Sequence, residues 1–165
     1  MRHTSDGEID AQVGAFGVNM REARHEVRLS QVALSEATKL DRAAISFLER
    51  AERAPDLSTL VRVARALDTT PALLLTGVGL SPLRAGGGLS AVQKSSDPGV
   101  RFGENLREAR TAAGLSQEAL AYEAVVDRAA ISVYERGRRE PNLRTVLKLA
   151  RALGLSPVTL LDGVK

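Results

Sequence analysis

The chain has 165 residues and a formal net charge of +3, with no cysteine, two histidines, two tyrosines, three phenylalanines and no tryptophan. These counts exclude disulfides, thiolate or three-histidine metal sites, cysteine nucleophiles and the aromatic surface on which single-strand binders stack bases. The hydrophobic content of 44% is enough for a globular core, and the small net charge is only a weak sign of an anionic partner.

The chain begins with a polar stretch. Residues 1–15 are polar and acidic, show no helical periodicity and do not look like a signal peptide. We expect them to form an N-terminal arm that is mobile in part. The most apolar run, residues 71–80, has about half the length of a membrane span, so we expect no membrane contact and a cytoplasmic protein.

An internal repeat organises the rest of the chain. Residues 16–78 align without a gap on residues 102–164 at a constant offset of 86, with 33 identities in 63 positions. Such a match predicts two copies of one fold, each a domain with these boundaries. Residues 79–101 lie between them, include three consecutive glycines and predict a linker.

Each repeat predicts five short helices in chain order. The first shows apolar residues at helical spacing, beginning with Phe16 and Met20 in the first repeat. The others are predicted by side chains that cap helix N-termini, with proline opening the fifth helix. These N-caps are Ser30, Asp41, Asp56 and Thr70, and in the second repeat Ser116, Asp127, Asn142 and Ser156. No stretch alternates with the period of a strand, so the predicted fold class is all-α.

The second and third predicted helices of each repeat are joined by about four residues, a connection that suggests a helix-turn-helix. Small helical bundles that bind no DNA also contain such turns. Periodicity and spacing leave both interpretations open.

The residues around this connection carry a family resemblance. They are Leu29-Ser30-Gln31, Asp41-Arg42-Ala43-Ala44-Ile45-Ser46 and Glu49-Arg50, with Leu115-Ser116-Gln117 and Tyr134-Glu135-Arg136-Gly137 in the second repeat. In combination they resemble the Cro/repressor-type (XRE) helix-turn-helix family. The resemblance implies two tandem five-helix lambda-repressor-like domains joined by a Gly-rich linker, whose third helices enter the major groove of double-stranded DNA. It also implies a bacterial cytoplasm or nucleoid, and we predict no cofactor and no small-molecule ligand.

Carried onto this sequence, the resemblance implies three sets of site residues. Those facing the groove are Arg42, Ala43, Ser46 and Phe47, with Arg128, Ala129, Ser132 and Val133. Those near phosphates are Gln31, Arg50 and Arg53, with Gln117, Arg136, Arg138 and Arg139. Structural ion pairs between the first and third helices are expected for Arg24 with Glu49 and for Arg110 with Glu135.

The groove-facing positions suggest how bases are read. Arg42 and Arg128 can each donate two hydrogen bonds to guanine O6 and N7, and a phosphate contact or a solvated side chain stays equally open. Phe47 and Val133 differ at one equivalent position, so we expect related half-sites that are not identical. Phe47 itself fits either a contact with thymine methyl groups or burial in a core or interface.

Two departures from the family pattern concern glycines. Lys39 and Val125 stand where the family often has glycine in the turn before the third helix. Ala51 stands where the second repeat has the expected Gly137 after that helix. We expect slightly different turns that avoid the left-handed conformation at these residues.

Charge is uneven between the repeats. From Arg128 to Lys148 six basic residues face two acidic ones, whereas from Arg42 to Arg62 four face three. Because phosphate contacts dominate the affinity for DNA, we expect the second repeat to be the stronger electrostatic binder.

These features predict a transcriptional regulator that reads two related half-sites with two heads in one chain and represses by occlusion. A homodimer stays open as well. The alternative is a protein-interaction or antitoxin-type module in which one or both repeats bind a partner protein.

No Gly-rich phosphate loop, metal-ligand spacing or Ser–His–acid arrangement supports an enzyme. His25 has Thr111 as its counterpart and is expected on the surface.

Overall fold

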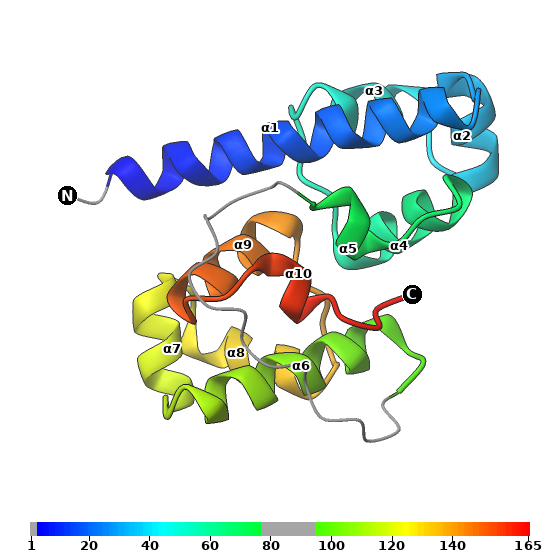
Figure 1. The fold of residues 1–165 in the computed structure, drawn as a ribbon. Helices are drawn as coiled ribbons and strands as arrows, with labels where there is room; N and C mark the ends of the chain where they lie inside the picture. The colour runs from blue at the N-terminus through cyan, green and yellow to red at the C-terminus, as the bar shows by residue number, and fades with distance from the viewer. Residues whose placement is uncertain (1–2, 77–94) are drawn as a thin grey trace.

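The computed structural model describes residues 3–76 and 95–165, and every regular element within these two ranges is a helix. The first repeat contains α1 (His3–Glu26), α2 (Gln31–Thr38), α3 (Arg42–Glu49), α4 (Leu57–Ala66) and α5 (Pro71–Leu74). The second contains α6 (Pro98–Ala112), α7 (Gln117–Ala124), α8 (Arg128–Glu135), α9 (Leu143–Ala152) and α10 (Pro157–Leu160). The predicted all-α fold with two tandem five-helix repeats is confirmed (Figure 1). Residues 79–94 of the predicted linker lie outside the described residues.

The helices begin at the polar side chains that predict their starts. Every predicted N-cap except Asp41 accepts a hydrogen bond from a backbone N–H of the first turn. Ser30 Oγ accepts from Ala33 N at 3.0 Å, and Asp56 Oδ1 accepts from Thr59 N at 2.8 Å. Each bond satisfies one of the backbone donors that a helix leaves unpaired at its start.

The buried apolar residues of the two repeats form one hydrophobic core. Phe16 on α1 and Phe102 on α6 are fully buried there. Close packing brings the first helix of each repeat onto the end of the third. A Cβ added at Gly17 would lie 2.8 Å from backbone oxygens at the end of α3, and one added at Gly103 would lie still closer to the backbone at the end of α8. Within the described ranges, no helix combines the length and apolarity needed to cross a membrane.

The prediction of an N-terminal arm over residues 1–15 is wrong. From residue 3 onward this stretch is part of α1, and Ile9 and Val13 are only 2% and 0% exposed. These two residues continue the apolar stripe of α1 upstream, where α1 contacts α9 of the second repeat. The helix is stabilised by a partner distant in the chain, which the local pattern does not show. The second repeat also starts earlier than predicted, because α6 begins at Pro98 after the N-cap Asp97.

The expectation that the turns avoid left-handed backbone is also wrong. Lys39, Ala51 and Val125 have φ angles of 55°, 58° and 52°, close to the 64° of Gly137. Lys39 and Val125 are the C-caps of α2 and α7, and their N–H groups donate to carbonyls of the preceding turn. The turn keeps the geometry that glycine favours, and residues with a Cβ accept the strain.

Replacing Val125 with glycine is expected to raise the free energy of unfolding by about 0.5–1 kcal/mol. A β-branched residue is strained in the left-handed region, and the Val125 side chain is 76% exposed, so its removal opens no cavity. Gly137→Ala serves as the opposite control, because a Cβ there would lie 2.7 Å from Val100 Cγ2. Urea denaturation followed by circular dichroism measures both variants. An unchanged or lower midpoint for Val125→Gly would contradict the expectation.

The two repeats contact each other around a local two-fold axis. Leu57 N donates to Pro141 O at 3.1 Å, and Leu143 N donates to Pro55 O at 2.8 Å. Under the offset of 86, each of these bonds is the symmetric copy of the other. In Figure 1, α1 runs from left to right and α6 from right to left, with α2 and α7 at opposite ends. The chain therefore contains an isologous interface between its own halves, as a symmetric dimer has between two subunits.

Candidate nucleic-acid interface

The outer face of α3 gathers the groove-facing residues predicted for the first repeat. Arg42, Ala43 and Phe47 are exposed and Ser46 is half-buried, while the opposite side of the helix is in the core. A groove of about 290 Å³ on this face is lined by Gln31, Arg42, Ala43, Ser46, Phe47 and Arg50. The Phe47 side chain is 39% exposed, so it does not belong to the core of its own repeat.

The outer face of α8 has the same arrangement in the second repeat. Arg128 and Ala129 are exposed at the start of the helix, and Ser132 and Val133 are half-buried one turn later. The opposite side of α8 is in the core. We refer to the helix pair α2–α3 as the first head and to α7–α8 as the second head.

Five of the arginines predicted to contact DNA have unoccupied guanidinium groups. Among the residues that the structure describes, none donates a hydrogen bond to or forms an ion pair with another side chain or carbonyl, and all five are exposed. They are Arg42, Arg53, Arg128, Arg138 and Arg139. A guanidinium without an intramolecular partner keeps all its donors for a base edge or a phosphate.

Two further predicted phosphate contacts are engaged within the protein. Arg50 pairs with Glu52, with 3.2 Å between Nε and Oε1, and its guanidinium lies 5.5 Å from the centre of the Phe47 ring. Arg136 folds back along α8, where its Nε donates to Ser132 O at 3.1 Å and its Nη2 donates to Ser132 Oγ. These contacts are at the surface, where a phosphate can replace them.

The loops after α3 and α8 differ in charge at one equivalent position. The first loop carries Glu52, and the second carries Arg138 at the corresponding place. Glu52 neutralises Arg50, whereas Arg138 adds a guanidinium that no described residue occupies. The second loop is therefore the more basic of the two.

Replacing Glu52 with arginine is expected to strengthen binding to any duplex. The slope of log K against the logarithm of the salt concentration should become steeper by roughly 1–2. The substitution removes a negative charge, frees Arg50 and adds a cation, which together create one or two further phosphate contacts. Arg138→Glu is the matched reverse change and should make the slope shallower. Fluorescence anisotropy titrations over a series of salt concentrations measure both slopes. Two slopes that shift in the same direction would count against this role for the loops.

A buried ion pair joins α1 to α3 beside the first head. Arg24 Nε donates to Glu49 Oε1 at 2.6 Å, and Arg24 Nη2 donates to Oε2 at 3.2 Å. Gln31 Nε2 donates to the same Oε2 at 2.9 Å. Arg24 Nη1 also donates to Leu29 O at 2.7 Å, which holds the end of α1 against the start of the first head.

The second repeat contains the same set of contacts. Arg110 Nε donates to Glu135 Oε1 at 2.6 Å, and Gln117 Nε2 donates to Glu135 Oε2 at 2.8 Å. In both repeats one amide N–H of the glutamine is used to hold the glutamate. Sequence reasoning assigned these glutamines to phosphate alone, and the structure gives them this intramolecular role as well.

The glutamate of the first pair is held in its charged form. Burial alone raises the pKa of Glu49, but hydrogen bonds from Arg24 and Gln31, with the charges of Arg24 and Arg21, outweigh burial and keep this pKa below its ordinary value. In the second repeat, the hydrogen bond to Glu135 raises the pKa of Arg110 against the effect of burial. The charged forms of Glu49 and of Arg110 are therefore the favoured ones in the folded protein.

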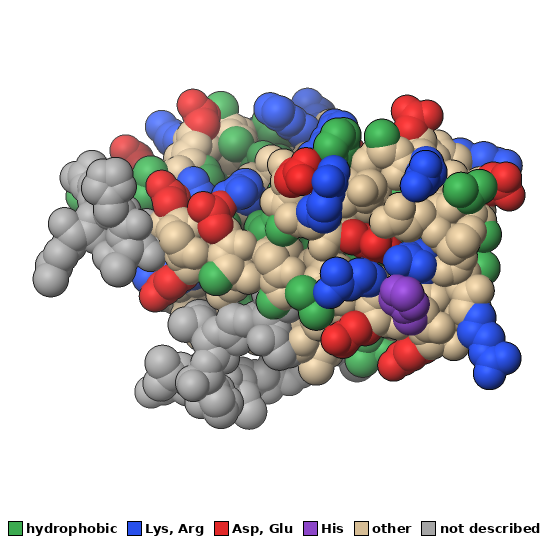
Figure 2. Space-filling view, turned by 90° about the horizontal axis from the view of Figure 1, so that it is seen from above, with side chains coloured by type: hydrophobic (Ala, Val, Ile, Leu, Met, Phe, Trp, Pro, Cys, Tyr) green, Lys and Arg blue, Asp and Glu red, His purple; other side chains and the backbone are tan. Residues whose placement is uncertain are grey.

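The charge excess counted for the second repeat is smaller on the folded surface. Arg144 pairs with Asp10, and Lys148 Nζ lies 4.0 Å from Asp6 Oδ1, so acidic residues of α1 offset two of the basic residues counted there. Seen from above in Figure 2, blue and red side chains are interspersed, and this face carries no continuous basic surface.

One family model, described as helix-turn-helix, matches the chain twice, at residues 20–74 and 106–160, which together make up about two thirds of its length. The chain belongs to the helix-turn-helix family. Each match contains one complete head, so each repeat is a helix-turn-helix domain in its own right. This confirms the resemblance seen in the motifs.

Several known proteins are similar to a stretch of 62 residues of this chain. The regulator YonR from the SPbeta prophage of Bacillus subtilis is 42% identical over 38% of this chain and 57% of its own length. The control protein C.BamHI of Bacillus amyloliquefaciens is 42% identical over 37% of this chain and 76% of its own. C.SmaI of Serratia marcescens is 45% identical over 38% of this chain and 74% of its own. Among solved structures, the restriction-modification controller protein C.AhdI from Aeromonas hydrophila has a TM-score of 0.37 and 51% identity, over 37% of this chain and 92% of its own.

Sequence reasoning missed one pair of positioning residues. Asn19 Nδ2 donates to Leu74 O and to Thr76 O, both at 3.0 Å, and so ties α1 to the end of α5. Asn105 makes the equivalent bonds from α6 to the end of α10. The signal was available, because an asparagine in a helix beside the apolar stripe is identical in both repeats.

Proposed function

We propose that this chain is a sequence-specific transcriptional regulator that binds double-stranded DNA with both of its heads and represses by occluding the DNA it covers. The exposed, unoccupied Arg42 and Arg128 support this proposal, because they stand at equivalent positions at the start of α3 and of α8. The relatives point in the same direction, since they are named as a transcriptional regulator and as control proteins.

The symmetric contact between the repeats is the observation that carries the two-headed part of the proposal. The reciprocal bonds between Leu57 and Pro141 and between Leu143 and Pro55 relate the heads by a local two-fold axis. A protein with two-fold symmetry matches a palindromic operator, with half-sites about one helical turn apart. One chain therefore provides the two heads that a symmetric dimer takes from two subunits. We propose that it binds an inverted repeat as one molecule per duplex.

The two half-sites are proposed to be related and not identical. Arg42 and Arg128 would read the same base pair in each half-site, and Ala43 and Ala129 would allow the same close approach. Phe47 and Val133 are the point of difference, with Phe47 placed to pack on thymine methyl groups. Ser46 and Ser132 lie on the same face.

Phosphates are assigned to the residues around each head. The free arginines Arg53, Arg138 and Arg139 would contact the backbone directly, and Arg50 and Arg136 would exchange their present partners for phosphate. Gln31 and Gln117 would use the amide N–H that does not hold the glutamate. Such contacts position the protein on the duplex and make its affinity depend on salt.

Selection of bound sequences from a random duplex pool tests the proposal. The expected product contains two related half-sites in inverted orientation at a fixed spacing, and the complex contains one chain per duplex. A single enriched half-site would show that only one head reads bases. If the intact protein binds no duplex even at low salt, DNA binding is refuted and the protein-interaction module takes its place.

A further inference from the structure

The N-terminal part of α1 reaches beyond its own repeat. α1 has 24 residues, whereas its counterpart α6 has 15. In Figure 1 the first turns of α1 extend past the first repeat and lie above α9 of the second. We call residues 6–13 of α1 the clamp.

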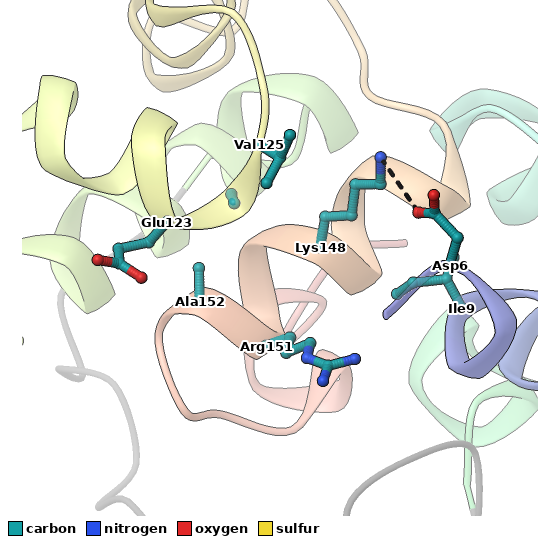
Figure 3. A pocket seen from close by; sticks show the side chains of 8 residues that line it. Asp6, Ile9, Glu123, Val125, Lys148, Arg151 and Ala152 are labelled. Carbon is teal, nitrogen blue, oxygen red and sulfur yellow. Dashed lines mark ion pairs between the residues drawn. The ribbon is translucent and has the colours of Figure 1, made fainter. Parts of the chain in front are cut away.

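The clamp is anchored to the second repeat by apolar burial. Ile9 and Val13 are 2% and 0% exposed, and they stand one turn apart on the face of α1 that meets α9. Figure 3 shows Ile9 at one side of a cavity of about 350 Å³, with Ala152 and Val125 of the second repeat on the other side. The clamp thus packs on α9 near its C-terminal end, and the cavity lies between the clamp and the end of α7.

Three ion pairs flank this apolar contact. Each joins an acidic residue of the clamp to a basic residue of α9, and the two helices run in opposite directions along the contact. The pairs are Asp10 with Arg144, Asp6 with Lys148 at 4.0 Å, and Glu8 with Arg151. The three basic residues lie on successive turns of α9, so the ion pairs extend along the contact between the two helices.

The sequence builds this contact on one side of the molecule only. The positions equivalent to the three acids of the clamp are Val92, Lys94 and Ser96, none of which is acidic. The clamp is therefore an addition to the symmetric interface and not a part of it.

We infer that the clamp fixes the orientation of the second head relative to the first and so determines the half-site spacing that the protein accepts. This inference rests on the proposed function. α1 is one continuous helix whose later turns belong to the core of the first repeat, so a rotation of the second repeat must break the clamp contacts. Two linked heads gain from each other's binding only where their geometry fits both sites at once.

A distance measurement between the heads tests the clamp without DNA. The chain has no cysteine, so Glu36→Cys and Tyr122→Cys, at equivalent exposed positions, place one nitroxide label on each head of the full-length protein. The clamp is weakened in two ways, by Asp6→Asn with Glu8→Gln and Asp10→Asn, and separately by Ile9→Ala. The control carries Glu22→Gln, Glu26→Gln and Asp68→Asn, which removes the same charge from exposed positions outside the clamp.

The expected result is a narrow distance distribution in the parent and the control and a broad one in both clamp variants. Circular dichroism confirms that each variant keeps its helices. Raising the salt to about 1 M, where the Debye length is about 3 Å, should broaden the parent distribution as well. One narrow distribution shared by all four proteins would overturn the inference.

The selected operator then tests the consequence for DNA. Inserting about five base pairs between the half-sites turns one of them by half a helical turn and should weaken binding of the parent at least about tenfold. The clamp variants should lose less than about threefold, because a second repeat held by the symmetric interface alone can separate from it and follow its half-site. Clamp variants that keep the parent's spacing profile would also overturn the inference. A parent that binds without any spacing preference refutes the two-headed proposal instead, and the label distances still decide about the clamp.

Discussion

Replacing Arg128 with alanine is expected to weaken binding to the selected operator by roughly 5- to 150-fold, or about 1–3 kcal/mol. The side chain is exposed at the start of α8 and has no partner among the described residues. Its guanidinium can therefore donate two parallel hydrogen bonds to one guanine, and alanine leaves those acceptors without a donor. For the same reason the stability of the fold should change by less than about 0.5 kcal/mol.

The decisive measurement compares operators that differ at single base pairs. Arg128→Ala should lose its preference at one base pair of one half-site, and the matched Arg42→Ala should lose it at the equivalent base pair of the other. Fluorescence anisotropy with each substituted duplex, and with an unrelated duplex as reference, gives these ratios. An equal loss on every sequence, the unrelated duplex included, would reassign Arg128 to a phosphate contact.

The helices of the repeats were predictable because their signals are local. A capping side chain such as Ser30 or Asp56 acts within its own first turn, so a few neighbouring residues contain the whole interaction. The clamp was not predictable in this way. Ile9 and Val13 stand at helical spacing, but their burial depends on α9, more than a hundred residues away in the chain.

The turns show a different limit of sequence reasoning. Val125 is a poor residue for left-handed backbone, and local preference favours some other turn. The structure keeps the left-handed turn because the two helices of each head pack against the same core. Tertiary packing overrides the local preference at Val125, which keeps a strained backbone conformation.

The exposure of the two predicted base-reading arginines could be expected from the sequence, but the contacts of their polar neighbours could not. The caps of α3 and α8 put Arg42 and Arg128 at exposed helix starts, as the structure shows. Whether a nearby polar side chain is free depends on distances of a few ångströms that no spacing reveals. Gln31 holds Glu49, and Arg136 lies back on α8.

Charge counted along the chain is misleading for a related reason. Lys148 falls in the basic stretch of the second repeat, but the acidic residue that faces it is Asp6 of α1. A window on the sequence counts neighbours in the chain, and electrostatics depends on neighbours in space. The charge of the second repeat is therefore smaller on the folded surface than the count along the chain.

Replacing Arg24 with methionine is expected to lower the stability of the first repeat by about 3–5 kcal/mol. The Arg24–Glu49 pair is buried, with each residue only 7% exposed. The substitution leaves the Glu49 carboxylate with the hydrogen bond from Gln31 as its one side-chain hydrogen bond among the described residues. Far-ultraviolet circular dichroism in urea measures the loss. Tyrosine fluorescence reports the second repeat by itself, because both tyrosines, Tyr122 and Tyr134, lie there.

Two companion variants separate the buried charge from other effects. Arg53→Met removes the same charge from an exposed position in the loop after α3 and should change stability by less than about 0.5 kcal/mol. Arg24→Met combined with Glu49→Leu removes both charges and should recover most of the loss, since the larger cost lies in an unpaired buried charge. A double variant as unstable as Arg24→Met would show that lost packing, and not the charge, is responsible.

The stability difference between the parent and Arg24→Met should depend on pH in the direction that an ionised buried pair predicts. In the parent the pKa of Glu49 is lowered, so its contribution is fully present above the unfolded pKa of about 4.3 and is lost as the pH falls through the folded value. In Arg24→Met burial is opposed only by the hydrogen bond from Gln31 and the charge of Arg21, so we expect the pKa of Glu49 to rise. That variant is then least stable at neutral pH and recovers as acid protonates the carboxyl group. The stability gap between parent and variant should therefore close from neutral pH toward about pH 4. A gap of constant size over this range would mean that Glu49 does not change its ionisation and would refute the electrostatic origin of the effect.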